Sequence, residues 1–151
     1  MKTKEINREK KTLLLYDDQS FIIRSMFISL EDLGWNVEFV SKIDDLFLRL
    51  KQRHFDVIIL DIMSRLPQEC KHVCFTELEL CNMDDGMNTG VVLAKKIWDL
   101  DEYKDTPIIF LSGKSNPIPN DRELQQHNCS YLRKPVFARD IDQVICIMLN
   151  Q

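Results

Sequence analysis

Short apolar runs of about five residues recur along the chain, and polar segments with helical spacing separate most of them. Several of these runs are unbroken Leu, Ile and Val stretches, which indicates strands that are buried on both faces. Such strands belong to parallel sheets that lie between two layers of helices. The pattern therefore predicts an α/β domain. The expected strands are 12–16, 36–40, 56–60, 107–111 and 129–132, and the expected helices are 19–33, 43–52, 88–99, 119–126 and 137–149.

Two segments depart from this alternation. The helix expected over 119–126 is the weakest, because Leu124 is the only apolar residue in its middle, and a weakly packed helix is a candidate moving part. Residues 64–85 separate the third strand from the next helix and are long for a βα connection. Apolar side chains at near-helical spacing predict a short amphipathic helix over 69–81 within this insertion. A mobile surface loop is the alternative that the sequence leaves open.

Reactive side chains follow four of the predicted strands. Asp17 and Asp18 come after the first strand, Asp61 after the third, Ser112 after the fourth and Lys134 after the fifth. The carboxyl ends of parallel strands meet at one edge of a sheet, which is where open α/β domains bind ligands. The sequence therefore predicts one crevice that contains three carboxylates, a hydroxyl and an ammonium group.

Each of these residues also has a plainer interpretation. An aspartate after a strand often caps the next helix, a Ser-Gly pair is an ordinary turn, and a single lysine is usually solvated. Their combined position favours a chemical site. Clustered carboxylates raise one another's pKa or bind a cation, and hard oxygen ligands favour Mg²⁺. An aspartate can also attack phosphorus, and an ammonium group and a hydroxyl would stabilise the transferred phosphoryl group.

Composition narrows the class of protein. The 151 residues are enough for one domain, 44% of them are hydrophobic, and the net charge of −4 disfavours nucleic acid as a partner. Residues 1–11 carry five basic side chains and lack the apolar core of a signal peptide, so we interpret them as a flexible basic tail before a domain that spans 12–151. No run reaches transmembrane length, so we expect no membrane association and a cytoplasmic location.

The five cysteines are an odd number in a chain without a secretion signal, which favours reduced thiols. Cys129 and Cys146 lie among apolar residues and are expected in the core. Cys70, His72, Cys74 and Cys81 raise the question of zinc, but their spacing is not the paired pattern of zinc ligands. Whether these four residues do more than pack is left open.

The ordered set of strand-end motifs resembles the response-regulator receiver domain, the phosphoacceptor module of two-component signalling. The motifs are the Asp17-Asp18 pair, VIILD ending at Asp61, LSG at 111–113 and YLRKP at 131–135, and the resemblance covers residues 12–149 apart from the long connection. It implies a flavodoxin-like, three-layer α/β/α fold with a five-stranded parallel sheet in the order 2-1-3-4-5.

The resemblance assigns a role to each acidic residue of the crevice. Asp61 matches the aspartate that receives the phosphoryl group. Asp17 and Asp18 match the acidic pair that holds Mg²⁺, together with Asp61 itself. The backbone carbonyl of Met63 would complete the protein ligands of the metal ion.

Other matched residues would respond to the phosphoryl group. Ser112 matches the switch hydroxyl, Lys134 the phosphate-binding lysine and Tyr131 the switch aromatic residue. The peptide bond between Lys134 and Pro135 is expected to be cis. The side chains of Met63 and Lys114 occupy positions that tune the removal of the phosphoryl group by water.

The function implied is that of a stand-alone receiver. Asp61 would accept a phosphoryl group from a sensor histidine kinase or a histidine phosphotransfer protein, and the signal would pass to a downstream protein by contact or by phosphorelay. Turnover of a separate substrate is not expected, so the protein would not be an enzyme in that sense. The apolar first helix is a candidate docking face for the histidine-bearing partner, and Ile147 and Leu149 on the last helix raise the possibility of a homodimer.

The chain departs from the receiver pattern after Asp61. Receivers usually pass quickly to a proline and an Asp-Gly pair, whereas here Pro67 is displaced and Asp85-Gly86 follows only after about twenty residues. The insertion is a candidate lid, docking element, dimer contact or tolerated loop. A phosphorylation-independent interaction module therefore remains the main alternative function. A phosphatase is disfavoured because Met63 stands where a second aspartate is expected, and a flavin protein because Asp17 and Asp18 would repel its phosphate.

Overall fold

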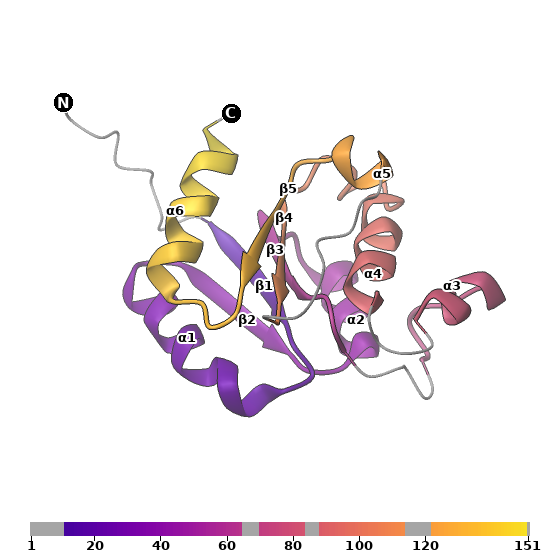
Figure 1. Ribbon diagram of the computed structural model, residues 1–151, viewed down its shortest axis with the longest axis horizontal. Coiled ribbons are helices and arrows are strands. Elements are labelled where there is room, and N and C mark those ends of the chain that lie inside the picture. Colours follow the sequence, from indigo (N-terminus) through magenta and orange to yellow (C-terminus); the bar gives the residue numbers. More distant parts are fainter. Residues whose placement is uncertain (1–10, 65–69, 84–87, 114–121, 151) are drawn as a thin grey trace.

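The computed structural model describes residues 11–64, 70–83, 88–113 and 122–150. Five parallel strands form one sheet with the order β2-β1-β3-β4-β5, as expected (Figure 1). The strands are β1 (Thr12–Tyr16), β2 (Asn36–Val40), β3 (Val57–Asp61), β4 (Ile108–Ser112) and β5 (Cys129–Arg133). The helices are α1 (Ser20–Asp32), α2 (Ile43–Gln52), α3 (Glu77–Asn82), α4 (Thr89–Trp98), α5 (Arg122–Gln125) and α6 (Ala138–Leu149).

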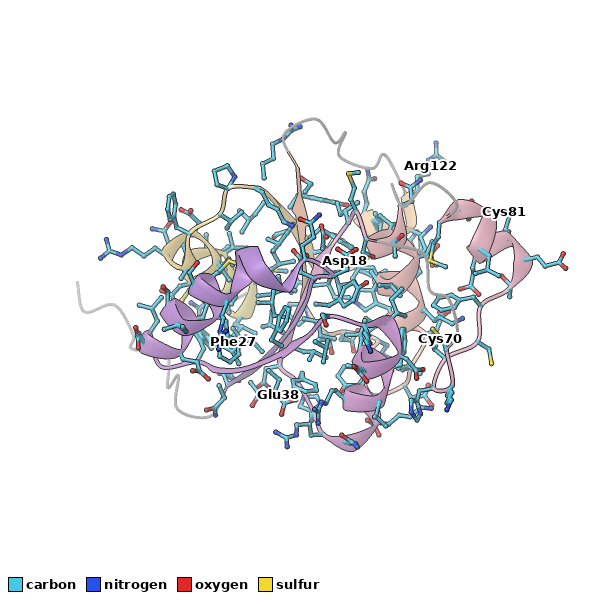
Figure 2. All side chains as sticks on the ribbon, turned by 90° about the horizontal axis from the view of Figure 1, so that it is seen from below. Asp18, Phe27, Glu38, Cys70, Cys81 and Arg122 are labelled. Carbon is cyan, nitrogen blue, oxygen red and sulfur yellow. The ribbon has the colours of Figure 1, made fainter. Side chains whose placement is uncertain are left out.

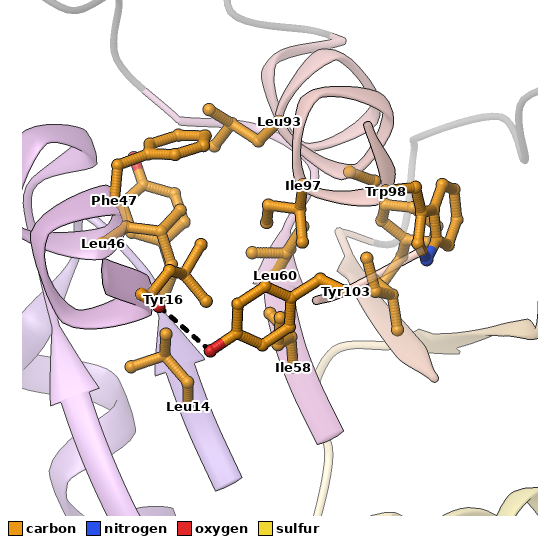
Figure 3. Close-up of a cluster of buried hydrophobic side chains, with 14 of the residues drawn as sticks. Leu14, Tyr16, Leu46, Phe47, Ile58, Leu60, Leu93, Ile97, Trp98 and Tyr103 are labelled. Atoms are coloured by element: carbon orange, nitrogen blue, oxygen red, sulfur yellow. Dashed lines mark hydrogen bonds between the residues drawn. The ribbon is translucent and has the colours of Figure 1, made fainter. Parts of the chain in front are cut away.

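Helices cover both faces of the sheet, which confirms the three-layer architecture. Alternate side chains of β1 point to opposite faces, so Leu13 and Leu15 pack with α1 and α6 while Leu14 and Tyr16 pack with α2 and α4. Figure 3 shows the cluster on the α2 and α4 side, in which Tyr103 packs with the side chains of β3. The hydroxyl of Tyr103 shares its one proton between the carbonyls of Arg53 (2.8 Å) and Leu50 (3.2 Å), at the end of α2.

The expected elements are present, with small shifts of their bounds. β3 begins and ends one residue later than expected, so Asp61 is the last residue of the strand rather than the first residue after it. Asp56, which was expected in the strand, instead accepts a hydrogen bond from the amide of Thr12 (2.9 Å) through its side chain. The weak helix expected over 119–126 is present only as α5, four residues long, while 119–121 lie outside the described residues.

The helix expected over 69–81 is wrong in its extent. α3 covers only Glu77–Asn82 and begins at a capping box in which Thr76 and Glu79 exchange side-chain and backbone hydrogen bonds. Upstream of it, one carboxylate oxygen of Asp44 accepts hydrogen bonds from the amides of Lys71 (2.8 Å) and His72 (2.6 Å). These bonds hold the segment on α2 in a non-helical conformation, so the helix cannot extend to residue 69.

Residues 70–83, which we call the strap, lie beside α2 and α4 (Figures 1 and 2). Lys51 of α2 donates a hydrogen bond to the carbonyl of His72 (3.1 Å). Lys96 of α4 contacts both carboxylate oxygens of Glu79 at 3.1 Å and lies 5.3 Å from the centre of the Phe75 ring. The strap is therefore fastened to both helices, while Leu78 on its outer side is 71% exposed.

In the described part of the chain, none of the helices combines the length and apolar character that crossing a bilayer requires. Residues 1–10 of the expected basic tail 1–11 lie outside the described residues, and so do Pro67 and Asp85-Gly86 of the insertion.

Candidate functional site

Three carboxylates meet at the carboxyl edge of the sheet. Strands β1 and β3 are neighbours with Tyr16 opposite Leu60, so the residues that follow, Asp17 and Asp61, lie side by side. One carboxylate oxygen each from Asp17, Asp18 and Asp61 can be chosen so that all three lie within 4.8 Å of one another. Asp17 is completely buried and Asp61 is 4% exposed, whereas Asp18, which is labelled in Figure 2, is partly exposed.

Lys134 is the counter-charge of this cluster. Its ammonium group lies 2.7 Å from a carboxylate oxygen of Asp17 and 3.5 Å from one of Asp61. The backbone amide of Lys134 donates to the carbonyl of Ser112 (2.6 Å), and the Lys134–Pro135 bond is cis, as expected. Burial disfavours the charged form of this lysine, but the hydrogen bond to Asp17 and the charge of Asp61 outweigh it and raise its pKa.

The environment of Asp61 opposes its ionisation. Burial contributes most, the charge of Asp17 adds to it, and the effect of Lys134 only partly offsets them, so the pKa of Asp61 rises to about 7. The site thus carries more negative charge than one ammonium group neutralises whenever all three aspartates are ionised. A divalent cation would remove this excess.

The stability of the metal-free protein should therefore fall as pH rises. Asp61 binds a proton more tightly in the folded state, at about pH 7, than in the unfolded chain, at about pH 4. Between these values the folded state holds more protons, so the free energy of unfolding decreases from pH 4 to pH 7 and this contribution is constant above that. Asp61→Asn should be more stable than the wild type by about 4 kcal/mol at pH 8, with little difference at pH 4. Urea denaturation in EDTA at the two pH values measures this; a pH-independent difference would contradict it.

The acidic cluster fits Mg²⁺. All its side-chain donors are hard carboxylate oxygens, the ligand type that Mg²⁺ prefers. The assigned carbonyl ligand belongs to Met63, two residues beyond Asp61, and its side chain is exposed.

The two expected switch residues lie on adjacent strands next to the cluster. Ser112 ends β4 and is buried, and its hydroxyl has no hydrogen-bond partner among the described residues. Tyr131 of β5 is partly buried and stacks on Phe110 with the ring centres 5.2 Å apart. Lys114 lies outside the described residues. The roles of Ser112 and Tyr131 remain predictions.

Four residues next to the cluster were not among the sequence-based candidates. Gly90 lies where α4 meets the end of β3, and a Cβ atom there would be 2.5 Å from the carbonyl oxygen of Asp61 and 2.7 Å from Cα of Ile62. Only glycine permits this approach. Tyr16, Ser64 and Thr89 form buried hydrogen bonds close by. The -NTG- segment before an apolar helical run was the available sign of a helix start that must pack closely.

No zinc site is found at the cysteines of the strap. Within the described ranges, the aspartate cluster is the only group of three or more His, Cys, Asp or Glu side chains placed to share a metal ion. His72 faces Asp44 at 4.0 Å, and Cys74 and Cys81 are exposed. The prediction that Cys129 and Cys146 are core residues is only partly right, because both are partly exposed; the Cys129 thiol donates to the carbonyl of Leu124 (3.3 Å).

Comparison with known proteins gives a match in structure but not in sequence. No protein-family model matches the chain, and no curated protein does. A receiver domain (CheY-like) from Methanospirillum hungatei JF-1 superposes with a TM-score of 0.66 at 21% identity, covering 93% of this chain and 98% of the other. One from Clostridium thermocellum gives 0.63 at 23% identity, with 93% and 94% covered, and the chemotaxis protein CheY4 of Vibrio cholerae gives 0.64 at 21%, with 91% and 98% covered. The chain therefore has the fold of response-regulator receiver domains, as its strand-end motifs led us to expect.

Proposed function

We propose that this protein is a phosphoacceptor receiver in which Asp61 accepts a phosphoryl group from a phosphohistidine of a partner protein. One observation carries the proposal: the carboxylate of Asp61 is buried at the carboxyl edge of a receiver-type sheet, with two further carboxylates and an ammonium group around it. Its surroundings also raise the pKa of this carboxyl to about 7, and strongly shifted carboxyls gather at functional sites.

The transfer uses the residues of the crevice directly. A carboxylate oxygen of Asp61 attacks the phosphorus, the P–N bond to histidine breaks, and the ring leaves as neutral imidazole with its other nitrogen protonated. Asp17, Asp18 and Asp61, with the Met63 carbonyl, would hold Mg²⁺, which neutralises charge on the phosphoryl oxygens when bound. Lys134, already within 3.5 Å of Asp61, supplies a further positive charge at the acceptor.

The acyl phosphate then favours one of two arrangements of the neighbouring strands. Ser112 has a buried hydroxyl that can donate to a phosphoryl oxygen, and Tyr131 next to it can change its packing against Phe110 in response. The rearranged surface passes the signal to a downstream protein by contact or by phosphorelay.

The surface beside the crevice suits a partner that delivers the phosphoryl group. A hollow of about 270 Å³ lies between α1 and the start of α6, and its lining includes Met26, Pro135, Phe137 and Lys134 itself. Phe137 is 72% exposed, and Ile28 of α1 is exposed as well. A helical, histidine-bearing partner on this apolar surface would stand next to Asp61.

Intact-protein mass spectrometry tests the function. After incubation with Mg²⁺ and acetyl phosphate, the wild type should gain one phosphoryl group, and so should Asp105→Ala, which removes an exposed carboxylate outside the crevice. Asp61→Ala and the wild type in EDTA should gain none. If the wild type neither gains a phosphoryl group nor binds beryllofluoride, the phosphorylation-independent interaction module is favoured. An adduct that persists in Asp61→Ala would place the acceptor elsewhere.

A further inference from the structure

The two ends of the long connection between β3 and α4 lie close together, next to the carboxylate cluster. Thr89, at the start of α4, donates a hydrogen bond from its hydroxyl to the backbone carbonyl of Ser64 (3.1 Å). The amide of Gly90 donates to the carbonyl of Ile62 (2.9 Å). These two bonds join residues that are 25 and 28 positions apart, directly after Asp61 and directly before the body of α4.

A third hydroxyl ties this junction to the first strand. Tyr16, the residue before Asp17, donates from its phenol oxygen to the side-chain oxygen of Ser64 (2.9 Å). Tyr16 is 1% exposed, and Ser64 and Thr89 are buried as well. Hydrogen bonds in such surroundings are stronger than at the surface, and a buried group left without its partner carries a large penalty.

The junction solves a problem that the insertion creates. Residues 65–88 separate Ser64, where the insertion begins, from Thr89, where it ends; we call these two ends the stems. A long connection constrains its ends poorly unless other contacts join them. The strap has fastenings of its own on α2 and α4, through Asp44, Lys51 and Lys96. The hydroxyl bonds at Ser64 therefore fix the stems independently of how the rest of the connection is arranged.

We propose that Tyr16, Ser64 and Thr89 form a clasp that closes the base of the insertion and so positions the segment from Ile62 to Ser64, with the Met63 carbonyl, for Mg²⁺ binding. The three hydroxyl residues are positioning residues: they act through the backbone of that segment. The inference rests on the proposed function, because it assigns the carbonyl of Met63 to the metal ion.

Thr89→Val tests the clasp, since valine keeps the shape of threonine and removes only the hydroxyl. Two readouts are compared with the wild type: the dissociation constant for Mg²⁺ from isothermal titration calorimetry, and hydrogen exchange of the Gly90 amide. That amide lies in the first turn of α4 and bonds to Ile62 instead of to its own helix, so it reports on the junction. The Ile62 amide, which bonds to Leu111 across the sheet, is the internal control.

We expect Thr89→Val to weaken Mg²⁺ binding about tenfold, which corresponds to one buried hydrogen bond, and to speed exchange at Gly90 but not at Ile62. Thr89→Ser, which restores the hydroxyl, should recover both properties. An unchanged affinity for Mg²⁺ together with a lower stability to urea would show a merely structural hydroxyl and overturn the proposal. So would unchanged exchange at Gly90.

Tyr16→Phe tests the clasp from the other side. It removes the phenol hydroxyl and keeps the ring in the core, so it should also weaken Mg²⁺ binding and speed exchange at Gly90. If the wild type binds no Mg²⁺, the proposed function is contradicted. If the wild type binds Mg²⁺ and the Tyr16→Phe and Thr89→Val variants bind it with the same affinity, only the clasp is contradicted. The exchange readout tests the junction in either case.

Discussion

Replacing Lys134 with methionine will lower the free energy of unfolding by about 3 kcal/mol at pH 8 and slow phosphorylation of Asp61 about a hundredfold. The substitution keeps most of the side-chain volume but leaves Asp17 and Asp61 buried together without their counter-charge, which now lies 2.7 and 3.5 Å from them. The loss of stability should shrink towards pH 5, because Asp61, with a pKa of about 7, is then protonated.

Urea denaturation without divalent cations measures the first effect, and the time course of the mass increase with acetyl phosphate measures the second. Adding Asp17→Asn to Lys134→Met should restore most of the lost stability, because it removes the carboxylate to which the ammonium group donates its hydrogen bond. Lys104→Met, at an exposed lysine, is the matched control and should change neither property. A destabilisation by Lys134→Met that is equal at pH 5 and pH 8 would show that the charge of Asp61 does not contribute to the loss, and the double variant then separates the pairing with Asp17 from packing.

Replacing Gly90 with alanine will destabilise the fold and disturb the site at the same time. A new methyl group would meet the carbonyl oxygen of Asp61 at 2.5 Å and Cα of Ile62 at 2.7 Å, and both are backbone atoms that cannot rotate away. Alanine favours a helix over glycine by about 1 kcal/mol, but overpacking against rigid backbone outweighs this, so we expect a net loss of about 2 kcal/mol. The added methyl group would push α4 and the end of β3 apart. This would displace Asp61, the last residue of β3, and so weaken Mg²⁺ binding.

The matched control for Gly90→Ala is Asn88→Ala. Asn88 precedes the same helix, is exposed and makes no capping hydrogen bond with its side chain. Its replacement should change stability by less than about 0.5 kcal/mol and leave Mg²⁺ binding as it is. Should Gly90→Ala prove as stable as the wild type with unchanged affinity for Mg²⁺, the close contact between α4 and β3 would not constrain the site.

The strap shows where reasoning from sequence reached its limit. A near-helical spacing of apolar residues suggested a helix from residue 69, yet the helix begins only after Thr76. The residues that carried this prediction are Cys74, Phe75, Leu78 and Cys81. The Thr-x-x-Glu capping box was visible in the sequence and marks this start. What no local pattern reveals is that Asp44, a residue of another helix, captures the backbone amides just upstream.

The clasp was missed for a similar reason. Tyr16 ends the strand expected over 12–16, and its ring packs in the core. Its hydroxyl pairs with Ser64, which is 48 positions away in a connection that has no periodicity. A partner of this kind follows from the path of the backbone, and nothing in the order of residues near Tyr16 indicates it.

The sequence by itself determined the parallel sheet, its flanking helices and the edge at which the chemistry gathers. Those features follow from the short-range spacing of apolar residues and from the reactive residues at the strand ends. Both are local properties of the chain. Only the tertiary structure decided that Lys134 bridges Asp17 and Asp61, that Gly90 lets α4 approach the acceptor, and that the insertion closes at Ser64 and Thr89. Each of these depends on distances between segments that are remote in the chain, and packing of the whole domain sets such distances.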